Sequence, residues 1–289
     1  MAITLNVIGA GKLGKTLARL WCDKHLVSIG AVASRSLESA GEAVIFIGSG
    51  TATQTLSDLP PAELWLLATP DSEIQATAER LHNSDQLRDT DILLHCSGSL
   101  SSNILVGAAT QHLVSVHPVH SFASPTQSLQ TFSGSYCAIE GEEHAKQRVT
   151  ALFEAIGAEL FPVSSDAKTL YHSASVLACN ALVGLLDTSL QAMNAAGVPR
   201  SLAQQILLPI VHQTVDNTLQ RSPIEALTGP VSRGDHATVA RQLSALTQID
   251  TGASDIYRSL GQRTLAIARE QGLDSHLAAQ IDLLFSDNS

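Results

Sequence analysis

The stretch NVIGAGKLGKTL, residues 6–17, decides the fold of the first half of the chain. An apolar run leads directly into GAGKLG (9–14), whose glycines follow the spacing GxGxxG, and a helical pattern follows. In this context the first glycine allows a tight turn, the second lets a pyrophosphate approach the backbone, and the third lets helix and strand pack closely. The stretch predicts a dinucleotide-binding turn, and the alternative is a glycine turn without a ligand. The residues expected to border the dinucleotide are Gly9, Gly11, Lys12, Leu13 and Gly14.

An arginine between two serines follows the second apolar run, at Ser34, Arg35 and Ser36. Many dinucleotide-binding chains carry an acid near this position, which accepts hydrogen bonds from the ribose 2′-hydroxyl of NAD. A carboxylate would repel the 2′-phosphate of NADP, whereas a guanidinium offers paired donors to it. These three residues therefore predict NADP as the cofactor. The alternative interpretation is a solvated turn with an exposed arginine.

The first half of the chain alternates short apolar runs with helical stretches. Several runs are continuously apolar, as expected for strands that helices cover on both faces. The expected strands are 5–9, 27–34, 43–48, 64–70, 91–98, 113–118, 136–141 and 158–163. This pattern predicts an α/β fold with a doubly wound parallel sheet of the Rossmann type.

The pattern changes after Pro162, because residues 166–285 show helical spacing without a convincing strand. We therefore expect two domains: an NADP-binding Rossmann domain over 1–163, and a helical domain over 164–289 for substrate binding and dimerisation. The most apolar run, ASVLACNALVGLL (174–186), is too short to span a bilayer and predicts a buried helix.

The composition of the chain argues against several classes of protein. The 289 residues include 17 basic and 27 acidic side chains, which give a net charge of −10 and argue against nucleic acid or an anionic membrane as partners. The four cysteines are far apart and form no CxxC pair, so neither a disulfide framework nor a metal site is predicted. With no leader-like segment at the start, the chain is expected to be cytoplasmic.

Polar residues close three of the expected strands. Because the carboxyl ends of parallel strands meet at one edge of a sheet, these residues should line one crevice. Thr69 and Pro70 are expected to border the ribose and pyrophosphate. Ser97 and Gly98 are expected beside the nicotinamide ribose or the substrate. An ordinary strand-to-helix turn is the alternative for both pairs.

His117 is the first candidate for proton transfer, because it emerges at a strand end before Pro118. The near-neutral pKa of histidine suits a proton shuttle, and a histidine that only bonds a turn is the alternative. The helix that begins near Asp166 adds His172 and Asn180, which either recognise substrate or form a polar seam between helices. The predicted catalytic set is therefore His117, His172, Ser97 and Asn180.

Four segments of the sequence are similar to those of a known protein family: LHCSGSLSS (94–102), SVHPVHSFASP (115–125), YHSASVLACNALVGL (171–185) and LTGPVSRGD (227–235). They resemble a bacterial family of Rossmann-like proteins with a helical C-terminal domain of unknown function. That family is grouped with the pyrroline-5-carboxylate reductases and the 6-phosphogluconate dehydrogenase-like superfamily. The order of Ser97 and His117 before proline is also similar to prephenate dehydrogenases, in which such a serine and histidine meet the substrate.

The resemblance implies an NADP-dependent oxidoreductase that works as a homodimer through its C-terminal helices. With the motifs above, it predicts hydride transfer to or from a C=O or C=N carbon of a small polar, anionic substrate in a cleft between the domains. An alternative from another class is a non-catalytic NADP-binding sensor. The 3-hydroxyacid dehydrogenases use a lysine and an asparagine one turn apart, where this chain has Lys168 and His172. A lysine-based mechanism is therefore not carried over.

Overall fold

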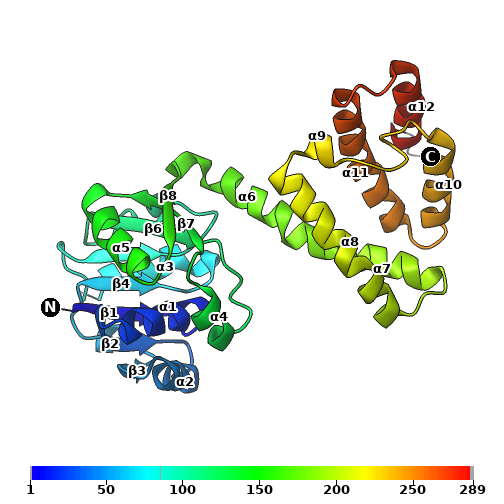
Figure 1. Ribbon diagram of the computed structural model, residues 1–289. Helices are drawn as coiled ribbons and strands as arrows, with labels where there is room; N and C mark the ends of the chain where they lie inside the picture. Colours follow the sequence, from blue (N-terminus) through cyan, green and yellow to red (C-terminus); the bar gives the residue numbers. More distant parts are fainter. Residues whose placement is uncertain (1, 85, 287–289) are drawn as a thin grey trace. The chain divides into compact units, whose positions relative to one another are not determined.

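The computed structural model of the protein describes residues 2–84 and 86–286. The chain divides into two compact units, Met1–Leu177 and Ala178–Ser289. Figure 1 shows strands confined to the first part of the chain, and the helices that follow. The mostly parallel sheet and the helical C-terminal region confirm the predicted fold class.

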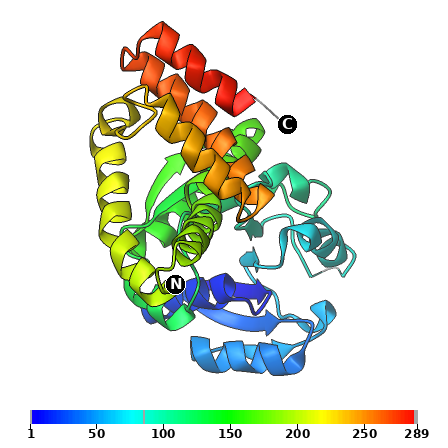
Figure 2. The same ribbon diagram turned by 90° about the vertical axis from the view of Figure 1, so that its right-hand side faces the viewer.

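The first unit contains one eight-stranded sheet, whose strands are β1 (Ile3–Ile8), β2 (Val27–Ala33), β3 (Thr51–Thr53), β4 (Leu64–Leu67), β5 (Ile92–His95), β6 (His112–Pro118), β7 (Tyr136–Gly141) and β8 (Glu159–Pro162). Their spatial order is β3-β2-β1-β4-β5-β6-β7-β8, which contains the strand order of a dinucleotide-binding sheet. Neighbouring strands pair in parallel except β6 and β7, which are antiparallel with His117 opposite Ala138, so β7 and β8 run against the other six strands. Figure 2 gives a second view of this sheet.

Helices of the first unit cover both faces of the sheet, as the alternating pattern predicts. They are α1 (Lys12–Asp23), α2 (Leu37–Ile47), α3 (Asp71–His82), α4 (Pro125–Thr131) and α5 (Glu143–Ala155), with short 3₁₀ turns η1 (Leu56–Asp58), η2 (Ser102–Leu105) and η3 (Ser165–Ala167). Two apolar clusters result. One joins Trp21 of α1 and Phe153 of α5 to the sheet, and the other joins Ile74 of α3 to it.

The segment 43–48 was expected to be a strand, and this expectation is wrong because the segment lies in helix α2. The hydroxyl of Ser36 caps the start of α2, and Gly48 ends the helix with φ +86°. A six-residue apolar run does not distinguish a strand from a buried helix by itself. The strand that occupies this edge of the sheet is β3, which has only three residues. The buried residues of α2 have helical spacing: Ala40, Ala43 and Ile47.

Helix α6 (Lys168–Ala178) belongs to the first unit, so the chain divides after Leu177 and not at the predicted 163/164. The reason is local. Lys168, the first residue of α6, is buried, and its ammonium donates to the carbonyl oxygen of Ser97 at 2.8 Å. The first turn of α6 is thereby fixed to the end of β5.

The second unit contains only helices among its described residues. They are α7 (Asn180–Ala195), α8 (Arg200–Gln220), α9 (Pro223–Ala226), α10 (His236–Thr247), α11 (Thr251–Glu270) and α12 (Ser275–Ser286). Helices α7 and α8 pack against each other, and the last three helices enclose a small apolar core that contains Val239, Leu265 and Phe285. Figure 1 shows α8 in yellow and the last helices in orange and red.

The apolar run 174–186 was expected to be a buried helix, and this expectation is wrong for the single chain. Val183 is 69% exposed and Leu177 is 70% exposed. The run is part of a longer helical stretch, residues 165–195, which by length and composition alone is sufficient to cross a membrane. Its first turns are nevertheless fixed to the sheet through Lys168, so the uncovered apolar side chains lie farther along the stretch.

Candidate functional site

A pocket of about 620 Å³ lies at the carboxyl ends of β1, β2 and β4 in the first unit. Eight of the predicted cofactor-binding residues line it: Gly9, Gly11, Lys12, Leu13, Ser34, Arg35, Thr69 and Pro70. Open parallel sheets bind nucleotides at this edge. The structure therefore brings the glycine turn, the arginine and the β4 end together around one cavity.

The backbone of the glycine turn fits a dinucleotide. Gly9 has φ +110°, and a Cβ atom there would collide with the carbonyl oxygen of Ala68. A Cβ atom added to Gly14 would lie 2.8 Å from the carbonyl oxygen of Gly9. Gly14 therefore allows α1 to pack closely on the strand, and it does not line the pocket. No side chain caps the start of α1 and no acid lies in its first turn. Its N–H groups and positive dipole are thus available to a phosphate.

The residues of the serine–arginine–serine segment have two different roles: Ser34 and Arg35 line the pocket, and Ser36 caps a helix. Arg35 lines the pocket, and its carbonyl oxygen accepts a hydrogen bond from the side chain of Gln54 at 3.1 Å. Ser36 caps helix α2 and is not a pocket residue. Sequence reasoning missed Ser39, Gln54 and Arg80, which also line the pocket. Ser39 lies one helical turn beyond the segment, and Arg80 lies on α3, so spacing from the glycine turn does not reveal them.

Ser97 and Gly98 do not line this pocket but lie beside it. The hydroxyl of Ser97 donates to Asp71 at 2.6 Å, and Asp71 follows the pocket residue Pro70 at the start of α3. The Ser97 hydroxyl also accepts hydrogen bonds from the backbone N–H groups of Ser99 and Leu100. The turn after β5 is thus fixed to the edge of the nucleotide pocket.

Two histidines converge above Gly98, the residue that follows this serine. A Cβ atom added to Gly98 would lie 2.8 Å from Nε2 of His117 and would collide with Nδ1 of His172. The two rings are perpendicular, with centroids 5.3 Å apart. Nδ1 of His172 is buried and has no hydrogen-bond partner among residues 2–84 and 86–286. Two imidazole nitrogens therefore border one point at the edge of the sheet.

His117 does not have the near-neutral pKa that the sequence argument assumed. Burial, and then the neighbouring His172 and Lys168, lower its pKa to about 4, although Asp71 acts in the opposite direction. At pH 7 the ring is neutral. Its Nδ1 is 2.9 Å from the hydroxyl of Tyr171, so Nε2 is the nitrogen that lies toward Gly98 and the ring of His172.

A buried lysine, Lys168, holds the turn after β5 that carries Ser97 and Gly98. The ammonium of Lys168 contacts the carbonyl oxygen of Ser97 and the hydroxyl of Ser115, and lies 3.8 Å from Glu140. Burial lowers the pKa of Lys168 to about 8. Lys168 is 1% exposed, so its ammonium lies in the protein interior. Glu140 is buried as well, and its carboxylate accepts bonds from Ser102 and Ser165.

The buried His95 and the partly buried His117 are expected to make the fold sensitive to acid. Burial lowers the pKa of His95 to about 4, like that of His117, whereas unfolding restores values near 6.5. Between these values the unfolded chain binds up to two more protons, so the free energy of unfolding should fall as pH is lowered from about 6.5 to about 4. Urea titrations at several pH values measure this, and His117→Gln should reduce the slope. A flat profile across the window would contradict the assignment.

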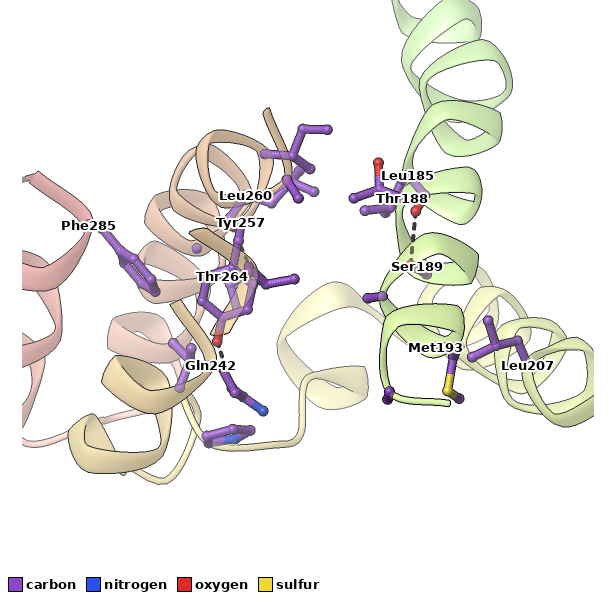
Figure 3. A pocket seen from close by; sticks show the side chains of 18 of the residues that line it. Leu185, Thr188, Ser189, Met193, Leu207, Gln242, Tyr257, Leu260, Thr264 and Phe285 are labelled. Atoms are coloured by element: carbon purple, nitrogen blue, oxygen red, sulfur yellow. Dashed lines mark hydrogen bonds between the residues drawn. The ribbon is translucent and has the colours of Figure 1, made fainter. Parts of the chain in front are cut away.

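Asn180, the fourth predicted catalytic residue, is exposed at the start of α7 and belongs to the second unit. That unit has a pocket of its own, of about 640 Å³ (Figure 3). Apolar side chains such as Leu185, Met193 and Phe285 line it, and Tyr257 donates to Gln242 at 2.7 Å. None of the described lining residues is charged, so this pocket has no acid or base for proton transfer near pH 7.

Comparisons with known proteins match two successive parts of the chain, and the boundary between the matches lies earlier than the division between the two structural units. Residues 2–118 match the Rossmann-like domain family, and residues 135–264 match the family described as domain of unknown function DUF2520. The second match begins at β7, within the sheet-containing unit. No curated protein matches the chain.

Solved structures share the fold. A protein from Thermotoga maritima is 26% identical with a TM-score of 0.72, over 93% of this chain and 99% of that one. A candidate NADP oxidoreductase from Bacteroides fragilis is 22% identical with a TM-score of 0.75, over 93% and 98%. Pyrroline carboxylate reductase from Plasmodium falciparum, solved with NADP bound, is 11% identical with a TM-score of 0.58, over 92% and 98%.

This chain is thus structurally similar to NAD(P)-dependent oxidoreductases. The resemblance read from the sequence blocks is confirmed in its architecture. The chain joins a Rossmann-like N-terminal domain to a C-terminal domain of the DUF2520 family.

Proposed function

We propose that the protein is an NADP-dependent oxidoreductase that acts on a C=O or C=N carbon of a small polar, anionic substrate. The observation that carries the proposal is the convergence of His117 and His172 on Gly98, next to the nucleotide pocket. The hydrogen bond from Ser97 to Asp71 connects the turn that carries Gly98 to the edge of the nucleotide pocket. A nicotinamide dinucleotide, when bound, supplies the hydride chemistry.

The residues of the nucleotide pocket have separate roles in this proposal. The glycine turn and the start of α1 hold the pyrophosphate, because their N–H groups and the helix dipole favour an anion. Thr69 and Pro70 border the ribose. Arg35 binds the 2′-phosphate through its guanidinium, with hydroxyl support from Ser34.

The two histidines differ in their roles. His117 is neutral near pH 7 and binds the reacting oxygen or nitrogen of the substrate. Nδ1 of His172, which lacks a partner within the described chain, is the group placed to exchange a proton with that atom. A general acid or base must come within hydrogen-bond distance of the proton it moves, and both nitrogens border the same point.

A substrate panel tests the proposal. Keto acids, hydroxy acids and cyclic imines are incubated with the protein and either NADPH or NADP, and nicotinamide absorbance is followed. A compound turned over by the wild type but not by His172→Ala supports the proposal. Binding of NADPH without turnover of any compound would favour the alternative of a non-catalytic sensor. A reaction that His172→Ala and His117→Ala both catalyse at the full rate would contradict the site.

We also propose that the protein is a homodimer formed through α6, α7 and α8. Leucine and valine side chains line a groove of about 900 Å³ between α7 and α8, which the single chain leaves open. The apolar residue Val183 of α7 is also exposed. A second copy of the chain offers the same apolar helices, and interfaces of such obligate dimers are rich in apolar side chains.

Light scattering at micromolar concentration is expected to give twice the chain mass of 30.4 kDa. Val183→Glu should lower the mass toward that of one chain, because the dimer would have to bury the new carboxylate in its apolar interface. Val106→Glu replaces an equally exposed valine of the first unit, 72% exposed, and should leave the mass unchanged. A monomeric wild type would contradict the proposed dimer.

A further inference from the structure

The hydroxyl of Tyr171 meets the ring of His117 at the nitrogen that faces away from Gly98. The hydroxyl oxygen is 2.9 Å from Nδ1, and the two rings are nearly perpendicular, with centroids 5.6 Å apart. Tyr171 itself packs edge-to-face against Phe161 of β8 at 5.9 Å. The phenol ring therefore contacts both Phe161 of β8 and His117 of β6.

The direction of this hydrogen bond follows from what the phenol can do. Burial raises the pKa of Tyr171 to about 12, so the hydroxyl keeps its proton near pH 7. The described residues offer this proton no other hydrogen-bond acceptor. If Nδ1 of His117 donated instead, the phenolic proton of this partly buried residue would have no partner among the described residues, and an unpaired donor shielded from water destabilises the folded state. The phenol therefore donates, and Nδ1 accepts.

A neutral imidazole carries one proton, and a bond accepted at one nitrogen places that proton on the other. Burial of His117, with His172 and Lys168 nearby, lowers its pKa to about 4, so the neutral form prevails near pH 7. Nε2 is then the N–H group, and together with Nδ1 of His172 it lies beside Gly98, 2.8 Å from where a Cβ atom of that residue would stand.

We propose that Tyr171 is a positioning residue that fixes the proton of His117 on Nε2, so that the site presents a hydrogen-bond donor to the reacting atom of the substrate. This rests on the proposed function for the identity of that atom. A carbonyl oxygen or an unprotonated imine nitrogen accepts such a bond. A protonated iminium nitrogen has no free lone pair and does not.

The proposal makes His117 an electrostatic group instead of a proton shuttle. A neutral imidazole that donates a hydrogen bond stabilises negative charge as it develops on an oxygen. The proposal also gives the two histidines different roles. His172 approaches the same point through Nδ1, which makes no hydrogen bond within the described chain. One ring donates, and the other remains free to take or give the proton.

Nitrogen NMR of protein labelled with ¹⁵N at its histidine rings tests the proposal without any substrate or cofactor. The signals of His117 are identified by their loss in His117→Asn. At pH 7 the wild type should show Nε2 protonated and Nδ1 unprotonated. Tyr171→Phe, which removes only the hydroxyl, should move both signals toward the average of two exchanging tautomers.

Tyr136→Phe is the matched control, because Tyr136 also packs against Phe161, with centroids 6.5 Å apart, but makes no hydrogen bond to His117. It should leave the signals of His117 unchanged. A wild-type proton on Nδ1, or a Tyr171→Phe spectrum identical to the wild type, would overturn the proposal. If the substrate panel finds a reaction, Tyr171→Phe should lower kcat about 2- to 10-fold, the effect of one hydrogen bond, with KM little changed.

These outcomes are independent of the proposed function. Failure of every compound in the panel would contradict the reductase and leave the tautomer result intact. An unfixed tautomer in a protein that turns over substrate would contradict the role of Tyr171 alone. Thermal unfolding of Tyr171→Phe, compared with Tyr136→Phe, verifies that both variants remain folded during the NMR measurement.

Discussion

Replacing His117 by alanine is expected to lower turnover about 10²- to 10³-fold, with little change in the affinity for NADPH. The first effect is the usual consequence of removing one donor that stabilises developing charge. The second follows because His117 does not line the nucleotide pocket. Steady-state kinetics with a substrate from the panel, together with NADPH fluorescence titration, measures both quantities.

His117→Gln distinguishes the two roles that a histidine can take at this position. Glutamine offers an N–H donor but does not exchange a proton near neutral pH, so it should retain more activity than alanine if His117 acts as a donor. Activity equal to that of the alanine variant would favour a proton shuttle instead. His112→Ala, at the start of the same strand and partly exposed beside Glu142, is the control and should be close to the wild type.

Lys168→Met is expected to lower the free energy of unfolding by about 3–5 kcal/mol, the usual effect of removing one partner of a buried ion pair. Glu140 would then remain buried without its cation, and the carbonyl oxygen of Ser97 would lose its donor. Because Lys168 fixes the start of α6 to the turn below the two histidines, activity should fall as well. Urea unfolding and kinetics on the same samples measure the two effects.

Lys146→Met is the matched control for this change. Lys146 also pairs with a glutamate, at 2.7 Å from Glu143, but both side chains are partly exposed on α5. Exposed pairs contribute about 0–1 kcal/mol, so the control should be nearly as stable as the wild type. Equal effects of the two substitutions would contradict the structural role given to Lys168.

The sequence alone was sufficient to predict most of the sheet and eight of the residues that line the nucleotide pocket. GAGKLG lies between a strand and a helix, and the ends of strands identify Thr69, Ser97 and His117 because parallel strands end at one edge. Helix α2 was missed because its apolar run has no strong periodicity and its two ends, Ser36 and Gly48, decide its structure.

Other features depend on contacts between distant parts of the chain. The link from Ser97 to Asp71 joins residues 26 positions apart, and that from Tyr171 to His117 joins residues 54 apart. Neither separation follows a local period. The low pKa of His117 likewise arises from burial, and a residue at a strand end gives no sign of how deeply its ring will be covered.

Binding of NADPH and NADH to the wild type and to Arg35→Ala tests the central claim most directly. Fluorescence titration should show that the wild type binds NADPH more tightly than NADH. Arg35→Ala should lose about 1.5–3 kcal/mol of NADPH binding, as expected for a hydrogen bond to a charged group, and should bind NADH as the wild type does. Absence of NADPH binding, or equal losses for both dinucleotides, would contradict the account.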